Sequence, residues 1–246
     1  MANYFLKYCE INLKRMVEFR LNFLFDIITM FLVNLLFYGS ILYLAYSNNG
    51  FGEFSFNDII MSVTIMQLAF IVGIGFFRGM DTLQSSIITG EFDKILVRPI
   101  NSYFHILISE VNLKIIGEIV SLIILLFLNN PINIPFILVF GIFSAVIFNL
   151  SLLLFQCIPF FTDMNNEIDF FDLVLGFSNY PPSIFNSFMK FLGFFIFPGL
   201  MISFGPIMIL KNPSFAYVYF GFIAILITAF VIVFNLGLKR YRSAGY

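Results

Sequence analysis

The sequence contains no tryptophan, one histidine, two cysteines and few charged residues. Charged side chains make up 11% of the 246 residues, against about 25% in a typical soluble domain. A chain with so few charges cannot cover a water-facing surface of ordinary polarity. The two cysteines, Cys9 and Cys157, lie far apart and form no metal-binding spacing. The histidine, His105, belongs to none of the motifs in which histidine binds zinc or assists a nucleophile. The sequence therefore predicts no catalytic site, no metal site and no cofactor in this chain.

Apolar residues dominate what is present. They make up 60% of the chain, and phenylalanine alone supplies 37 residues. Lipid is the solvent that tolerates such a surface. The net charge is −1 and no block of basic residues occurs, so we expect the lipid bilayer as a partner and no nucleic acid.

Six apolar runs are each long enough to cross a bilayer as a helix, which takes about 20 residues. The runs are continuous and do not alternate with period two, which favours helices over the strands of a membrane barrel. We predict an all-α integral membrane protein with one transmembrane domain over residues 1–246. Its six transmembrane helices are residues 21–46, 59–79, 106–128, 134–160, 187–210 and 215–238.

Residues 162–186 are the ambiguous part of this map. They carry four carboxylates, and a carboxylate in mid-membrane costs about 2.5–3.5 kcal/mol on insertion scales. We favour a cytoplasmic or interfacial segment here. The alternative is a short spanning helix, which would turn residues 187–210 into a re-entrant hairpin broken at Pro198 and Pro206.

Lysine and arginine predict the orientation, because loops rich in these residues stay in the cytoplasm. With six spans and the N-terminus inside, Lys211 is the one basic residue that falls outside. An even number of spans places both termini in the cytoplasm, and we expect a multi-pass protein of the cell membrane. The basic residues on the inner side, or near the inner ends of spans, are Lys7, Lys14, Arg15, Arg20, Arg78, Lys94, Arg98, Lys114, Lys190, Lys239, Arg240 and Arg242.

The longest hydrophilic connection, residues 80–105, contains a short amphipathic segment. Gly90 can begin a helix there, and Pro99 ends it. The pattern alone leaves two interpretations open: a helix that lies on the lipid headgroups, or a peg that docks into a soluble partner. One face of this helix carries the apolar side chains, Phe92, Ile95 and Leu96.

Three stretches in this order make the chain resemble a known family. The first runs from Gly90 to Ile100. The second is Tyr180-Pro181, followed by Phe197-Pro198 and Gly205-Pro206. The third is the tail from Leu236 to Gly245, in which basic residues precede Ser-Ala-Gly. Together they resemble the bacterial type-two ABC transporter permeases, the membrane-spanning subunits of ABC exporters. The chain lacks the tryptophan that this family often carries after its fourth helix.

The resemblance implies a permease subunit of an ATP-driven exporter. Its expected partners are ABC ATPase subunits, which hold ATP and Mg²⁺, and a second permease, either another copy or a paralogue. It implies an amphipathic elbow helix over residues 1–20 and a coupling helix within residues 80–105. This chain has no Gly-x4-Gly-Lys-Ser/Thr phosphate loop, so we expect ATP hydrolysis in a separate chain. The residues assigned to ATPase coupling are Gly90, Glu91, Phe92, Asp93, Ile95, Leu96, Arg98 and Pro99.

A charged stripe and two other functions remain open. Glu110, Lys114 and Glu118 recur every four residues on one face of the third predicted helix. They either neutralise one another as ion pairs or line a pathway through the membrane. The alternative functions are a non-transporting membrane scaffold or immunity protein, and a membrane-embedded enzyme. The substrate is not identified by any motif. The phenylalanine-rich helices could line a route for an amphipathic or lipid-like molecule, although phenylalanine that faces lipid or neighbouring helices is the default interpretation.

Overall fold

The structure is a computed structural model that describes residues 20–75, 82–98, 102, 105–106, 115–162 and 170–241. Within these ranges the regular elements are helices, apart from one isolated bridge between Phe51 and Phe54. The all-α architecture is as predicted. The predicted elbow helix over residues 1–20 lies outside the described residues, except for Arg20, which begins the first long helix.

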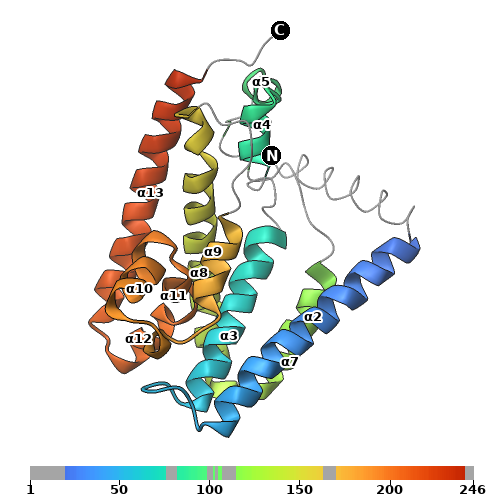
Figure 1. Cartoon of the computed structure of the whole chain (residues 1–246), viewed down its shortest axis with the longest axis vertical. Coiled ribbons are helices and arrows are strands. Elements are labelled where there is room, and N and C mark those ends of the chain that lie inside the picture. Colours follow the sequence, from blue (N-terminus) through green and yellow to red (C-terminus); the bar gives the residue numbers. More distant parts are fainter. Residues whose placement is uncertain are drawn as a thin grey trace.

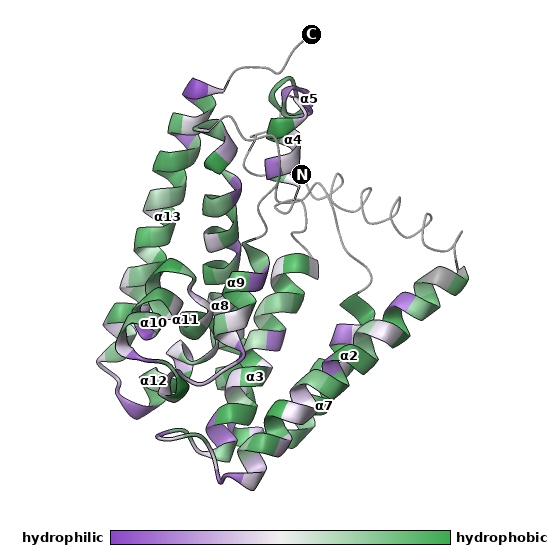
Figure 2. Ribbon diagram, in the orientation of Figure 1, coloured by the Kyte–Doolittle hydropathy of each residue, from purple (hydrophilic) through white to green (hydrophobic). Residues whose placement is uncertain are grey.

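Four described segments are long and apolar enough to cross a membrane. A fifth apolar helix, α7 (Ile116–Leu128), is shorter in the described part of the chain. Figure 2 shows hydrophobic residues along most of the length of these helices, with hydrophilic residues toward several of their ends. The four long segments are α2 (Arg20–Ser47), α3 (Phe56–Phe70) with its π-helical continuation η1 (Ile71–Gly75), α8 (Ile134–Gln156) with the short turns at its two ends, and α13 (Phe215–Arg240).

The helices form two groups. In one, α8 lies between α3 and α13 and packs against both; in the other, α2 pairs with α7 and leans away (Figure 1). Within the apolar span of α3, 72% of the residues are buried inside the chain, against 11% for α2. Thus α3 is a core helix, whereas most of α2 faces the lipid or a partner.

A tight loop joins α2 to α3. Gly50 and Gly52 adopt φ angles of 108° and 60°, a region that glycine enters without a steric penalty. Ser55 then caps α3: its side chain accepts a hydrogen bond from the Asp58 backbone, and the Asp58 side chain accepts one from the Ser55 backbone. This reciprocal cap fixes where α3 begins.

The prediction of one continuous spanning helix over residues 187–210 does not hold in the structure. Proline explains the break, because Pro198 supplies no backbone donor and Phe197 before it leaves the helical region, with φ −113° and ψ 76°. Four short elements replace the helix: α10 (Ser187–Phe191), the π-helix η7 (Leu192–Ile196), α11 (Gly199–Ser203) and α12 (Gly205–Lys211).

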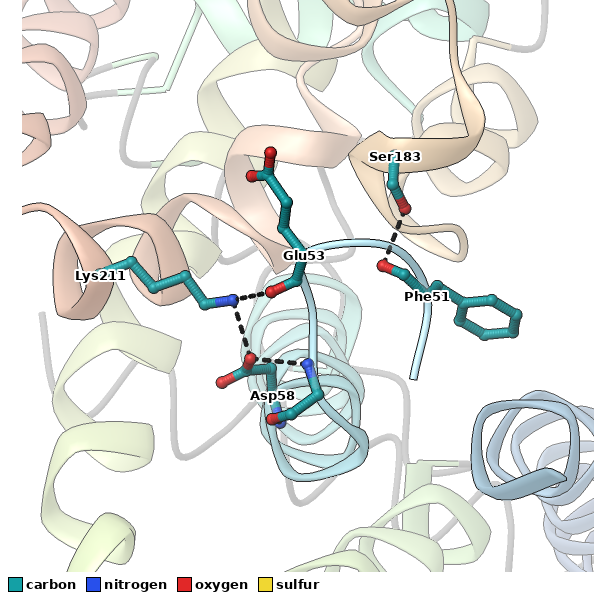
Figure 3. A network of polar contacts seen from close by, with 6 residues as sticks. Phe51, Glu53, Asp58, Ser183 and Lys211 are labelled. Carbon is teal, nitrogen blue, oxygen red and sulfur yellow. Dashed lines mark hydrogen bonds and ion pairs between the residues drawn. The ribbon is translucent and has the colours of Figure 1, made fainter. Parts of the chain in front are cut away.

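These four elements form a hairpin that enters and leaves at the same end of the molecule. Ser183, just before the hairpin, donates a hydrogen bond of 3.0 Å to the carbonyl oxygen of Phe51. Lys211, at its end, forms an ion pair of 3.0 Å with Asp58. Both contacts are made with the loop and cap that join α2 to α3 (Figure 3). Residues 187–210 therefore follow a hairpin path broken at Pro198, as in the alternative interpretation of this segment.

The segment before the hairpin leads from the C-terminal end of α8 to the α2–α3 loop. Phe170, which precedes α9 (Phe171–Ser178), stacks on Phe155 near the end of α8, with ring centroids 4.4 Å apart. The chain then continues through η6 (Pro182–Ile184) to the α2–α3 loop. Of the four carboxylates in residues 162–186, only Asp172 belongs to the described helix, where it is exposed in the first turn. The other three, Asp163, Glu167 and Asp169, lie outside the described residues.

The hairpin packs against α9 in close backbone contact. A side chain at Gly199 would overlap the carbonyl oxygen of Val174 and the backbone nitrogen of Ser178. Phe197, at the turn, stacks on Phe177 and Phe155 with centroid distances of 6.3 and 5.6 Å. Backbone contact and ring stacking together hold the turn of the hairpin in place.

We predict that Gly199→Ala lowers the free energy of unfolding by roughly 1–3 kcal/mol, the usual cost of overpacking a tight contact. Gly176→Ala is the matched control on α9, because its added methyl group would meet nothing within 4 Å. That control should be neutral or stabilise the helix by up to about 1 kcal/mol. Thermal unfolding of the two purified variants in one detergent measures both effects, and equal midpoints would contradict the close crossing.

Candidate functional site

Two short helices carry the predicted coupling residues. They are α4 (Leu83–Ile88) and α5 (Phe92–Leu96), joined by a turn in which Gly90 has a φ of 75°. They lie near the C-terminal end of α13, whereas the α10–α12 hairpin lies toward the opposite end (Figure 1). Gly90 therefore provides the reversal that places α5 at this end of the bundle.

Phe92 anchors α5 to the rest of the chain. Its side chain is fully buried, and its ring makes edge-on contacts with Phe160, Phe234 and Tyr241 at centroid distances of 5.3, 6.5 and 5.1 Å. We expected Phe92 to fill a groove in a partner together with Ile95 and Leu96. The structure corrects that picture, because Phe92 points into its own chain.

The C-terminal end of α5 presents apolar side chains to the surroundings. Leu96 is 42% exposed and Val97 85% exposed, and we call these two residues the Leu96–Val97 face. Ile95 is partly buried and packs against the cluster around Phe92. Beside the face, Lys94 and Glu91 form an exposed ion pair of 2.8 Å, and the hydrogen bond from Lys94 lowers the pKa of Glu91.

The other polar residues of this region contact their own chain. Burial, together with the nearby Asp93 carboxylate, raises the pKa of Tyr241 to about 12. Arg98 bonds to Nε2 of His105; burial, and then the charge of Arg98, lower the pKa of that histidine. Asp93 therefore lies beside the end of α13, whereas Arg98 bonds within the loop of residues 80–105. Pro99 lies outside the described residues.

Of the charged stripe, only Glu118 is described; Glu110 and Lys114 lie outside the described residues. Glu118 is 4% exposed, and its surroundings form a polar cluster between α2, α3 and α7. Sequence reasoning gave no role to the other members. A glutamine within the apolar second span and a serine three residues after Glu118 were the available signals. We define the intramembrane cluster as Asn34, Tyr38, Gln67, Glu118 and Ser121.

A third polar network ties the hairpin to the α2–α3 loop (Figure 3). Lys211 donates a hydrogen bond to the carbonyl oxygen of Glu53, pairs with Asp58 and lies 4.4 Å from the centre of the Phe54 ring. An exposed ion pair alone contributes only about 0–1 kcal/mol, but here three contacts converge on one ammonium group. Lys211 is the basic residue that the orientation analysis left outside.

Comparison with known families now decides what kind of protein carries these features. The family model described as ABC-2 family transporter protein matches residues 8–245, nearly the whole chain. The chain belongs to the ABC-2 transporter family. No curated protein and no solved structure matches it. The resemblance found in the sequence is thereby confirmed at the level of the family.

Membership of the ABC-2 family, together with the long apolar helices, indicates a multi-pass membrane protein. Proteins of this family are membrane subunits of transporters and are not themselves catalytic, and they normally work with ABC ATPases. In this ABC-2 chain, the helix that we predicted to couple to the ATPase is α5, with Phe92 inside and the Leu96–Val97 face outside.

We predict that Phe92→Ala lowers the free energy of unfolding by roughly 3–5 kcal/mol, because it removes a fully buried aromatic ring. Val97→Ala is the control on the same helix; since Val97 is exposed, its truncation should change the stability by less than about 0.5 kcal/mol. Thermal unfolding of the detergent-purified variants compares them. An unchanged midpoint for Phe92→Ala would mean that α5 is not anchored by this ring.

Proposed function

We propose that this chain is the permease subunit of an ATP-driven exporter whose ATPase is a separate polypeptide. The observation that carries the proposal is the arrangement of α5. Its first residue, Phe92, is anchored in the bundle, and its C-terminal end exposes Leu96 and Val97. Family membership over residues 8–245 supports a transport role.

The anchoring explains how hydrolysis in another chain would reach the membrane. ATP hydrolysis in a separate chain can act on the membrane helices only by moving an element that docks on the ATPase. Phe92 contacts Phe160, in the turn η5 (Ile158–Phe160) that follows α8, and Phe234 on α13. A push on the Leu96–Val97 face would therefore reach two long helices directly through packed rings, which resist compression.

The proposed topology has six crossings and a re-entrant hairpin. The α4–α5 loop and both termini would lie in the cytoplasm, and the α2–α3 loop with Lys211 would lie outside. The crossings would be α2, α3, the segment ending in α7, α8, the segment containing α9, and α13. Residues 1–20 would form the elbow helix, a second permease would complete the pathway, and ATP and Mg²⁺ would bind to the ATPase.

Single cysteines test this topology in a background in which Cys9 and Cys157 are replaced. Ser187→Cys and Ser214→Cys flank the hairpin, and both positions are exposed. We predict that a membrane-impermeant maleimide labels both from outside intact cells, whereas Lys94→Cys reacts only after permeabilisation. A single spanning helix over residues 187–210 would instead place Ser187 inside, so protection of Ser187→Cys with labelling of Ser214→Cys would refute the hairpin.

The double variant Leu96→Ala, Val97→Ala tests docking. We predict that it keeps the thermal stability of the original protein but loses at least tenfold in ATPase co-purification and in transport, because central apolar contacts carry most of the binding free energy of an interface. Glu91→Gln with Lys94→Gln is the control beside the face; loss of this exposed ion pair should cost only about 0–1 kcal/mol. Normal co-purification of the ATPase with the Leu96, Val97 variant would make α5 a helix that lies on lipid headgroups.

A further inference from the structure

The intramembrane cluster joins three helices through hydrogen bonds within the apolar part of the bundle. Tyr38 on α2 donates to Oε1 of Gln67 on α3. The side-chain amide of Gln67 donates to the backbone carbonyl of Glu118 and to Oγ of Ser121, at 3.3 and 3.1 Å, both on α7. Ser121 also accepts a bond of 3.5 Å from Asn34. Polar groups inside a membrane are costly and mark functional sites by default.

The hydrogen-bond donors of the cluster are directed inward. The hydroxyl of Tyr38, both amide hydrogens of Gln67 and the hydroxyl of Ser121 are used by partners within the cluster. Acceptor capacity is left over. Among the described residues, Oε2 of Glu118 has no hydrogen-bond partner, although it is buried. The unsatisfied acceptor is therefore a carboxylate oxygen, which can bind a cation or accept a hydrogen bond from a donor.

A groove adjoins the cluster and opens between α2 and α7. Its volume is about 120 Å³, and Asn34, Tyr38 and Ser121 belong to both the groove and the cluster. Glu118 lies behind this wall, one helical turn before Ser121, and does not itself line the groove. The remainder of its wall is apolar, and Gly39 leaves space on α2, since a side chain there would meet nothing within 4 Å. The other apolar residues along the groove include Phe31, Leu35, Leu42, Ile124 and Leu125.

These features select one class of ligand. A metal cation such as Ca²⁺ takes six to eight oxygen ligands, and the described residues contain no group of three or more candidate metal-binding side chains. A protonated amine needs fewer acceptors, and an apolar body attached to it would suit the groove. Pockets of this kind combine mostly apolar walls with a few polar groups that set the orientation of the ligand.

We propose that Glu118 is the recognition point for the protonated amine of an amphipathic ligand whose apolar body lies in the α2–α7 groove. The proposal rests on the proposed function, since that ligand would be the transported substrate or a close analogue. The polar cluster holds the backbone of Glu118 in register, because Gln67 and Ser121 both bond to its carbonyl oxygen. The carboxylate supplies the charge.

The test measures binding to the full-length permease in nanodiscs of phosphatidylcholine, a lipid without net charge. The probe is radiolabelled dodecylamine, which is protonated at pH 7 because alkylamines have a pKa near that of lysine, about 10. Binding to empty nanodiscs is subtracted. We expect one saturable site per chain, and at least tenfold weaker binding to the Glu118→Gln variant, which keeps the shape of the side chain.

Two controls make the outcome decisive. Asp172→Asn removes an exposed carboxylate on α9 and should leave binding unchanged. Dodecanol, which has the same chain without the charge, should bind equally to the original protein and to Glu118→Gln.

The proposal is overturned by unchanged dodecylamine binding to a Glu118→Gln variant that melts within 2 °C of the original protein. It is also overturned if labelled Rb⁺ or Na⁺ shows a saturable site that depends on Glu118, which would mean an inorganic cation. None of these measurements involves an ATPase, so failure here is distinct from failure of the docking experiment at Leu96 and Val97.

Discussion

Inside a bilayer no water is present to satisfy polar side chains, and several of those in this chain find their partners on neighbouring helices. Apolar contacts cannot specify the packing there, because lipid is as apolar as a leucine side chain. Asn129 after α7 donates to Thr64 on α3 at 2.7 Å. Ser144 on α8 donates to the carbonyl oxygen of Ile202 on α11 at 2.7 Å and lies 3.0 Å from the hydroxyl of Tyr219 on α13. These few bonds define which helices are neighbours and in which register.

Contacts along α8 and α13 connect the two ends of the molecule. The ring cluster around Phe92 joins α5 to Phe234 of α13 and to the turn after α8. Farther along these two helices, Ser144 and Tyr219 hold α11 of the re-entrant hairpin. The hairpin in turn reaches the α2–α3 loop through Lys211. A displacement that begins at α5 therefore has a continuous packed route along α8 and α13 to the hairpin.

Sequence reasoning recovered the long helices, because a run of about 20 apolar residues is a sufficient signal for a helix in a membrane. It did not recover the path of residues 187–210, because hydropathy counts apolar residues and carries no information on the direction of the chain. Pro198 was noted as a possible break. The turn that follows the break depends on the close crossing of α9 at Gly199, which is a tertiary contact. The amphipathic pattern of α5 identified an apolar side, yet only tertiary packing shows that Phe92 turns inward. In the sequence, Gln67 is a single polar residue in an apolar span. Only the structure shows that it bonds to Glu118 and Ser121.

The proposed ligand site and the proposed ATPase-docking face belong to different helix groups. Glu118 and the groove lie on the α2–α7 pair, whereas α5 is anchored to α8 and α13. The two groups meet along α3, where Gln67 bonds to α2 and α7 while the same helix packs on α8. Relative movement of the groups must therefore strain or break the bonds of Gln67. Because Gln67 and Ser121 also position the backbone of Glu118, such movement would alter the ligand site at the same moment, which is the linkage that a transport cycle requires.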